Sequence, residues 1–169
     1  MPLLKDGALI DDPWLRLAHD APLPGDGPVI VSLARFAAER AALLARDAPL
    51  GVVLKNTDDI DALAPDLVEL RLVVLEFPKF GDGRAYSQAR LLRERYGFSG
   101  ELRATGQVLP DQLHHMRRCG FDAFELAKGD PLQAWRRAAH SFSAVYQPTG
   151  DGRPPVSALR QRLFAVAAE

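Results

Sequence analysis

The feature that most constrains the fold is a regular alternation, from residue 28 onwards, between short apolar runs and segments with helical periodicity. The apolar runs are rich in valine and leucine, as strands buried on both faces of a sheet are. Strands that alternate with helices form parallel sheets through right-handed crossovers. The five expected strands are Val29–Val31, Gly51–Leu54, Leu72–Leu75, Glu101–Ala104 and Ala123–Leu126, with a weaker sixth at Ala144–Tyr146.

We therefore predict an α/β fold with a mostly parallel sheet of five or six strands and helices packed around it. So few strands form an open sheet or a partial β/α barrel, since a closed barrel of this type needs eight. Helix boundaries are marked by capping residues. Ser32, Asp82 and Asp130 are suited to begin helices, Pro110 to occupy a first helical position, and Gly120 to end a helix.

The chain is expected to form one domain with three parts. Residues 1–27 are an irregular leader in which Asp6-Gly7 separates two apolar runs, a pattern typical of a small hairpin. Residues 28–149 carry the α/β pattern. Residues 150–169 belong to the same domain and end in a helix with an apolar stripe. That helix packs on the body of the protein or on a partner, and a homodimer is left open.

Composition excludes several classes of protein. The chain of 169 residues has a net charge of -1, which argues against a general nucleic-acid binder. No apolar run reaches the ~18 residues of a membrane span. Cys119 is the single cysteine, so neither an intrachain disulfide nor a cysteine pair for zinc or iron–sulfur binding is available. These features predict a cytoplasmic protein with no membrane or nucleic-acid partner. No metal site is expected, because His114 and His115 are consecutive on a helix and point about 100° apart, and His19 and His140 are isolated.

Polar residues gather where the predicted strands end. Ligands of parallel α/β sheets bind beyond the carboxyl ends of the strands, so these side chains form the candidate ligand-binding site. The candidate residues are Lys55, Glu76, Lys79, Arg84, Tyr86, Ser87, Arg90, Arg103, Thr105 and Lys128. No catalytic residue is assigned among them.

Residues 77–95 suggest what such a site would bind. Gly81 and Gly83 allow a tight turn into a helix whose free N–H groups favour an anion, and Lys79 and Arg84 would add positive charge. In the alternative reading, Asp82 caps the helix and the arginines form a solvated face. Lys55 and Glu76 would transfer a proton or form a structural ion pair. No Walker loop or dinucleotide fingerprint is present, so no cofactor is evident.

Four stretches of the chain carry a resemblance to a known family. They are Phe77–Leu92, Gly100–Gly106, Asp111–Leu113 and Met116–Glu125. Over about residues 28–148 the chain resembles the bacterial family called domain of unknown function nine-three-four. Its members are often labelled probable oxidoreductases, and their genes typically lie beside that of assimilatory sulfite reductase. The family has no established catalytic residues.

The resemblance implies a role in sulfate assimilation, near the reduction of sulfite to sulfide. One interpretation is an accessory protein that has assimilatory sulfite reductase as its partner. The other is a small α/β enzyme, an oxidoreductase among the alternatives, acting on an anionic metabolite of sulfur assimilation. The charged candidate residues favour the enzyme, whereas the missing cofactor motif favours the accessory protein.

Overall fold

The protein, in a computed structural model, is built around one mixed sheet of eight strands in the order β2-β1-β8-β7-β6-β5-β4-β3. The structure describes residues 3–126, 129–140, 145–149 and 153–160. The strands are β1 (Leu3–Lys5), β2 (Ala8–Ile10), β3 (Leu15–Arg16), β4 (Val29–Ser32), β5 (Leu50–Leu54), β6 (Leu72–Phe77), β7 (Glu101–Gly106) and β8 (Ala123–Glu125). The helices are α1 (Leu33–Leu44), α2 (Arg84–Arg90), α3 (Leu113–Arg118) and α4 (Pro131–His140). Short 3-10 helices add η1 (Ile60–Ala62), η2 (Ala64–Glu69) and η4 (Pro110–Gln112), and a π-helical segment, η3 (Leu91–Arg95), follows α2.

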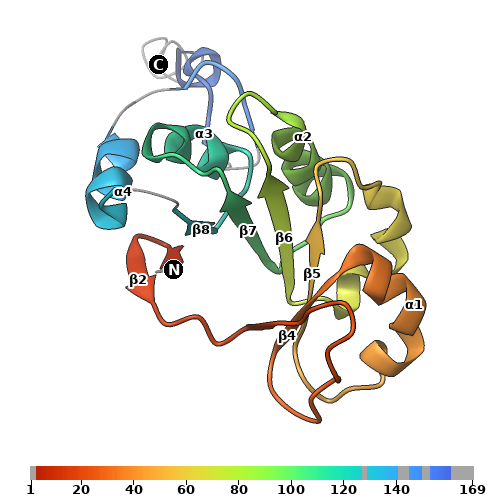
Figure 1. Cartoon of the computed structure of the whole chain (residues 1–169). Helices are drawn as coiled ribbons and strands as arrows, with labels where there is room; N and C mark the ends of the chain where they lie inside the picture. The colour runs from red at the N-terminus through yellow and green to blue at the C-terminus, as the bar shows by residue number, and fades with distance from the viewer. Residues whose placement is uncertain (1–2, 127–128, 141–144, 150–152, 161–169) are drawn as a thin grey trace.

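The sheet is curled into a half-barrel, and the helices lie along its outer side (Figure 1). Successive side chains of each strand point to opposite faces of the sheet, and both faces carry apolar residues. Val73 and Leu75 of β6 belong to the large core under the helices, whereas Leu72 and Val74 face inward with Ile30 of β4. Trp14 packs on this inner cluster from the segment that joins β2 to β3. That segment crosses the open side of the half-barrel (Figure 1).

The predicted α/β class and five of the predicted strands are confirmed, as β4 to β8, and they pair in parallel. The expected sheet of five or six mostly parallel strands was wrong, because the sheet has eight strands and is mixed. The predicted hairpin forms as β1 and β2 and joins β8 antiparallel, and the two-residue β3 extends the other edge. With two residues, β3 is too short to show a recognisable pattern of its own. The weak sixth strand is not part of the sheet, because Val145 pairs only with Pro155 within the described residues, and Ala144 lies outside them.

Four of the five predicted helix boundaries are confirmed, but Asp82 is not the N-cap of α2, because Gly83 holds that position without a side-chain cap. The Ser32 hydroxyl accepts the Arg35 N–H at the start of α1, and the Asp130 carboxylate accepts the N–H groups of Leu132 and Gln133 at the start of α4. Pro110 begins η4, and Gly120 follows α3 with a φ of +102°. Residues 156–160 are helical, and the rest of the predicted C-terminal helix lies outside the described residues.

A buried ion network fills the inner side of the half-barrel. The guanidinium of Arg103 on β7 is fully buried and donates to Glu101 at 2.9 Å, to Asp12 at 2.7 and 3.1 Å, and to Glu125 at 3.4 Å. Lys5 on β1 also binds Glu101, at 2.7 Å. Burial disfavours the charge on Arg103, but its hydrogen bonds and the neighbouring carboxylates raise its pKa overall.

This network joins the two ends of the sheet. Arg16 of β3, at one edge, lies 3.4 Å from Glu125 of β8, which is near the other edge. Thr105 also donates its hydroxyl to Glu125, at 2.6 Å. Three cations therefore meet three carboxylates across the concave face, with Lys5, Asp12 and Arg16 all coming from the N-terminal leader. The leader takes the place of the strands that would close a complete barrel.

Candidate functional site

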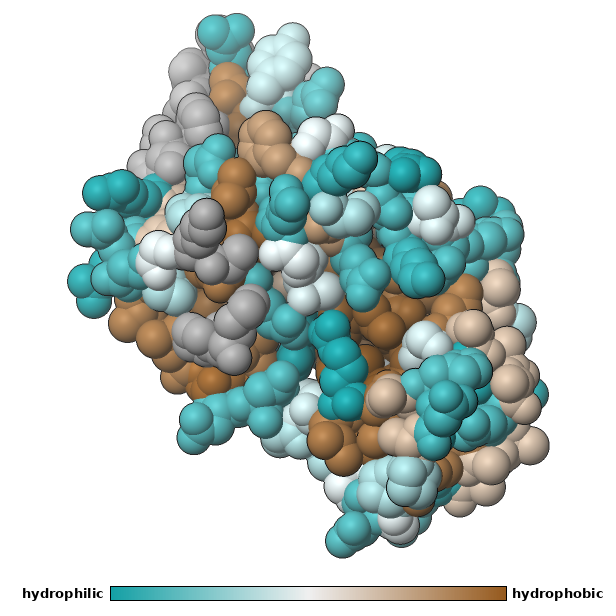
Figure 2. Space-filling view, viewed as in Figure 1, coloured by the Kyte–Doolittle hydropathy of each residue, from teal (hydrophilic) through white to brown (hydrophobic). Residues whose placement is uncertain are grey.

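A pocket of about 880 Å³ opens at the carboxyl ends of β4, β5 and β6. This volume lies in the range of small-molecule sites. One wall is apolar and is built by Leu33, Ala34, Phe36, Ala37, Val53, Ala62 and Pro65. The polar side chains around it are His19, Ser32, Arg40, Lys55, Asp58, Asp66 and Glu76. Figure 2 shows apolar surface gathered in the middle of one face of the molecule and framed by polar groups.

The loop that carries Lys55 is held in place from both sides. The Asp58 carboxylate accepts the Lys55 N–H at 2.9 Å. The buried amide of Gln88, on α2, donates to the carbonyl oxygens of Lys55 and Asp58, both at 3.0 Å. Gln88 therefore links α2 to the rim of the pocket, and the backbone at Lys55 is ordered before any ligand arrives.

Lys55 and Glu76 line this same pocket, at the ends of neighbouring strands. The half-buried Glu76 lies beside Thr105 in the sheet. Among the described residues Lys55 and Glu76 form no ion pair, so the structural pair that their positions suggested is absent. An ammonium group and a carboxylate that both face a partly apolar cavity can instead bind the charged or polar groups of a ligand, or exchange a proton with it.

In the turn before α2, Arg84 pairs with Asp82, and not with an external anion as the anion-site hypothesis proposes. The Asp82 carboxylate accepts the Arg84 backbone N–H at 3.3 Å and two side-chain N–H groups at 3.0 and 2.7 Å. Asn56 donates to the same carboxylate at 2.6 Å. Asp82 thus occupies the position that an external anion would take, and Lys79 is exposed beyond it. The hydrogen bonds from Arg84 are the largest cause that lowers the pKa of Asp82 to about 2.

The Asp82–Arg84 pair makes a direct prediction. In Arg84→Ala the pKa of Asp82 is expected to rise from about 2 toward its ordinary 3.8, with Asn56 keeping part of the shift. Because the folded-state pKa is the lowered one, the stability that this pair contributes is present above pH 3.8 and is lost as the pH falls through 2. Carboxyl ¹³C NMR titration measures the change. Arg90→Ala is the matched control, and an unchanged Asp82 titration in Arg84→Ala would contradict the pairing.

The other candidate residues on α2 do not face the pocket. Arg90 is exposed and pairs with Glu94 at 3.0 Å, one helical turn later. Ser87 lies beside Arg90 on the outer surface. The Tyr86 ring packs edge-on against Phe77 with 5.0 Å between ring centroids, and burial is the main cause that raises its pKa to about 12.

The remaining candidates lie on β7 and after β8. Arg103 and Thr105 belong to the buried ion network, where each already binds carboxylates of this chain. Lys128 lies outside the described residues. The ten candidates therefore do not form one site. Lys55 and Glu76 meet in the pocket, and the arginines with described side chains are each paired.

Several residues of the pocket and the network were missed by the sequence analysis. Ser32 ends β4, so the rule that selected Lys55 and Glu76 applies to it equally. Arg40 and Asp66 form an ion pair between α1 and η2, and nothing in the sequence indicates it. Asp12 lies in a leader without regular pattern, and its contact with Arg103 spans 91 positions.

Two observations concern other classes of site. Among the described side chains, no group of three His, Cys, Asp or Glu residues is arranged to hold a metal ion. None of the helices in the described ranges is both long and apolar enough to cross a membrane. Cys119 is buried, with its Sγ 3.8 Å from Nε2 of His115.

Sequence comparison places the chain in a family but gives it no named relative. Residues 51–157 match the family model described as "Bacterial protein of unknown function (DUF934)". The matched region runs from β5 through α4 and includes the pocket residues Lys55 and Glu76. No curated protein matches the sequence. Since the match covers more than half of the chain, this protein belongs to the DUF934 family of bacterial proteins.

Proposed function

We propose that this protein is an accessory component of assimilatory sulfite reduction that binds a small molecule in the pocket at the carboxyl ends of β4 to β6. The observation that supports binding is the pocket itself, with Lys55 and Glu76 facing a partly apolar cavity on an ordered rim. The connection with sulfite reduction rests on the resemblance of residues 77–125 to proteins whose genes accompany the reductase. A cytoplasmic location is part of the proposal.

The charge distribution favours an accessory role over turnover of an anionic substrate. Arg84, Arg90 and Arg103 each bind a carboxylate of this chain. Arg40, on the pocket wall, is paired with Asp66. Lys55 is then the one cationic side chain of the described pocket lining without an acidic partner, apart from His19. A single ammonium group suits a ligand with one negative group better than a polyanion.

Pocket variants in a deletion strain test this proposal. A strain lacking the gene is expected to grow on sulfide or cysteine and to fail on sulfate or sulfite. The wild-type gene should restore growth, Lys55→Met should not, and Lys79→Met should, because Lys79 is an exposed lysine outside the pocket lining. Growth of the deletion strain on all four sulfur sources would reject the role in sulfite reduction. Full rescue by Lys55→Met would show that the role in sulfite reduction does not depend on Lys55 in the pocket.

A second candidate function is catalysis on an anionic sulfur metabolite. The observation that favours it is the unpaired Lys55 beside Glu76, because an amine and a carboxylate in one cavity can act as a proton donor and acceptor. The two functions differ in a purified system. The accessory protein is expected to raise the turnover of purified sulfite reductase while having no turnover alone. Turnover by the protein alone, lost in both Lys55→Met and Glu76→Gln, would establish the enzyme instead.

A further inference from the structure

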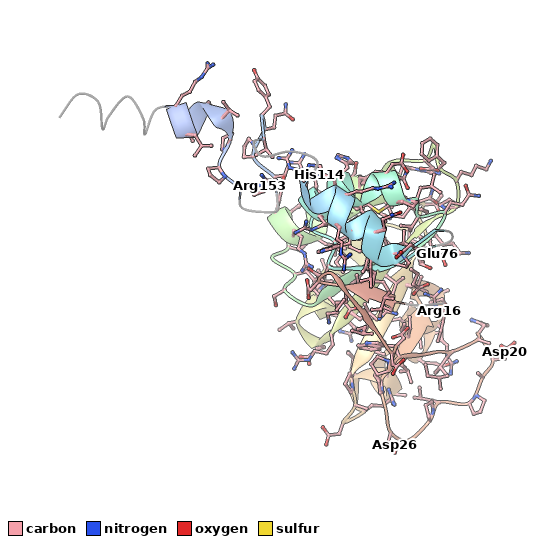
Figure 3. The ribbon with its side chains drawn as sticks, turned by 90° about the vertical axis from the view of Figure 1, so that its left-hand side faces the viewer. Arg16, Asp20, Asp26, Glu76, His114 and Arg153 are labelled. Atoms are coloured by element: carbon pink, nitrogen blue, oxygen red, sulfur yellow. The ribbon has the colours of Figure 1, made fainter. Side chains whose placement is uncertain are left out.

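A second pocket, of about 350 Å³, lies at the opposite ends of the strands from the first. It is bordered by Gly120, Phe121 and Asp122, which lead into β8, and by side chains of α3 and α4. His114 of α3 and Arg153 of the C-terminal segment both line it, and they appear next to each other in Figure 3, away from Glu76. The two pockets share no residue.

Arg117 is one of the arginines that line this pocket. Its guanidinium carbon lies 4.2 Å from the centroid of the Trp135 ring, close enough for a cation–π interaction. Within the described residues it donates no side-chain hydrogen bond and forms no ion pair. Its charge and its five N–H donors are therefore not used by a partner in this part of the chain, and the guanidinium lies against the Trp135 ring.

The hairpin turn packs against the indole of Trp135. Gly7 of the hairpin turn has a φ of +85°, and a Cβ at Gly7 would lie 2.3 Å from the indole Nε1 of Trp135. The absence of a side chain at Gly7 thus lets the indole lie directly on the turn. Arg117 therefore lies against Trp135, which itself packs on the hairpin turn. Such support from neighbouring residues is expected of a preformed site.

The acidic groups around Arg117 do not pair with it within the described residues. Four arginines line it, against the two carboxylates of Asp6 and Asp122. Asp122 is already engaged, since it accepts hydrogen bonds from Arg93 and from the Leu102 N–H. Asp6 is exposed at the hairpin turn. Neither carboxylate pairs with Arg117, whose positive charge lines the pocket.

We propose that this pocket is an oxyanion site, taking a small organic molecule that carries a phosphate- or sulfate-like group. The forked donors of an arginine match such a group in geometry and charge. A volume of about 350 Å³ exceeds what a lone tetrahedral ion fills and is at the lower end for organic ligands. The exposed Asp6 carboxylate can accept a hydrogen bond from a hydroxyl or amine of the organic part of the ligand. The inference is independent of the sulfite-reduction role and of the first pocket.

Tryptophan fluorescence and calorimetry test this site together. Trp14 and Trp135 are the two tryptophans of the chain, so Trp14→Phe leaves Trp135 as the reporter. Glycerol phosphate, inorganic phosphate and sulfate are titrated into the protein at constant ionic strength. Calorimetry gives the Kd of each probe for each protein variant. Arg117→Gln is expected to weaken binding at least tenfold. Arg136→Gln is the matched control, because Arg136 is an exposed arginine of α4 outside the pocket lining.

The outcomes are distinct. If glycerol phosphate binds more tightly than the inorganic ions, the result supports an organic ligand. If all three probes bind equally, the oxyanion site is supported, but the proposal that its ligand is an organic molecule is overturned. The site is overturned if none of the three probes binds saturably, or if Arg136→Gln weakens binding as much as Arg117→Gln does. If Arg117→Gln does not fold, Arg117→Lys keeps the charge without the fork and is expected to bind the probes less tightly than wild type.

Discussion

Replacing Arg103 with methionine is expected to lower the free energy of unfolding by about 3–5 kcal/mol, the usual cost of removing one partner from a buried ion pair. The side chain is fully buried and binds three carboxylates, from Asp12, Glu101 and Glu125. Methionine fills much of the same volume but neutralises none of them. Lys5 and Arg16 then face three carboxylates without the central cation.

Urea unfolding followed by circular dichroism measures this loss. Arg84→Met is the matched control, since it removes a guanidinium that is also paired but is exposed, and exposed pairs contribute roughly 0–1 kcal/mol. A loss below about 1 kcal/mol for Arg103→Met would mean that the inner face is hydrated and that the network does not hold the leader, because a desolvated pair costs more to break.

The second large effect is expected for Gly106→Ala. Gly106 ends β7 with a φ of +93°, in the left-handed region that costs other residues about 1–2 kcal/mol. A Cβ at this position would also lie 2.5 Å from the carbonyl oxygen of Phe77 on β6. That oxygen accepts the Gln107 N–H at 2.8 Å, so the clash is with backbone already fixed by a hydrogen bond.

Gly106→Ala is therefore expected to destabilise the protein by more than the ~1–2 kcal/mol of the backbone conformation alone. Gly81→Ala is the control, because Gly81 has no atom within 4 Å of its added Cβ and no positive φ. Thermal unfolding of the two variants gives the comparison. Similar melting temperatures for both would show that β7 can shift away from β6 at little cost.

The helix caps and the central strands were predictable because their signals are local. A run such as Leu72–Leu75 shows its burial in its own composition, and Asp130 with Pro131 begins a helix through contacts within three residues. The two edge additions to the sheet were not predictable as sheet members. β3 is two residues long, and its position depends on pairing with β4 rather than on its composition.

The candidate site was predicted in part for a related reason. The topology of parallel strands places Lys55 and Glu76 at one edge, and the structure brings both to one pocket. The same reasoning grouped Arg103 with them by its strand. Strand alternation and the crossing leader instead bury Arg103 against Asp12, a contact between residues 91 positions apart. Charge alone does not tell a free cation from one whose partner lies elsewhere in the chain.

That separation also has a consequence for synthesis in the cell. Asp12 emerges from the ribosome 91 residues before Arg103, which corresponds to roughly 5–18 s at typical rates of translation. During this interval Asp12 lacks the Arg103 guanidinium that it binds in the folded protein. The half-barrel therefore stays open until β7 and β8 have been made. Its closure is a late event, and chaperones have those seconds in which to bind the exposed leader.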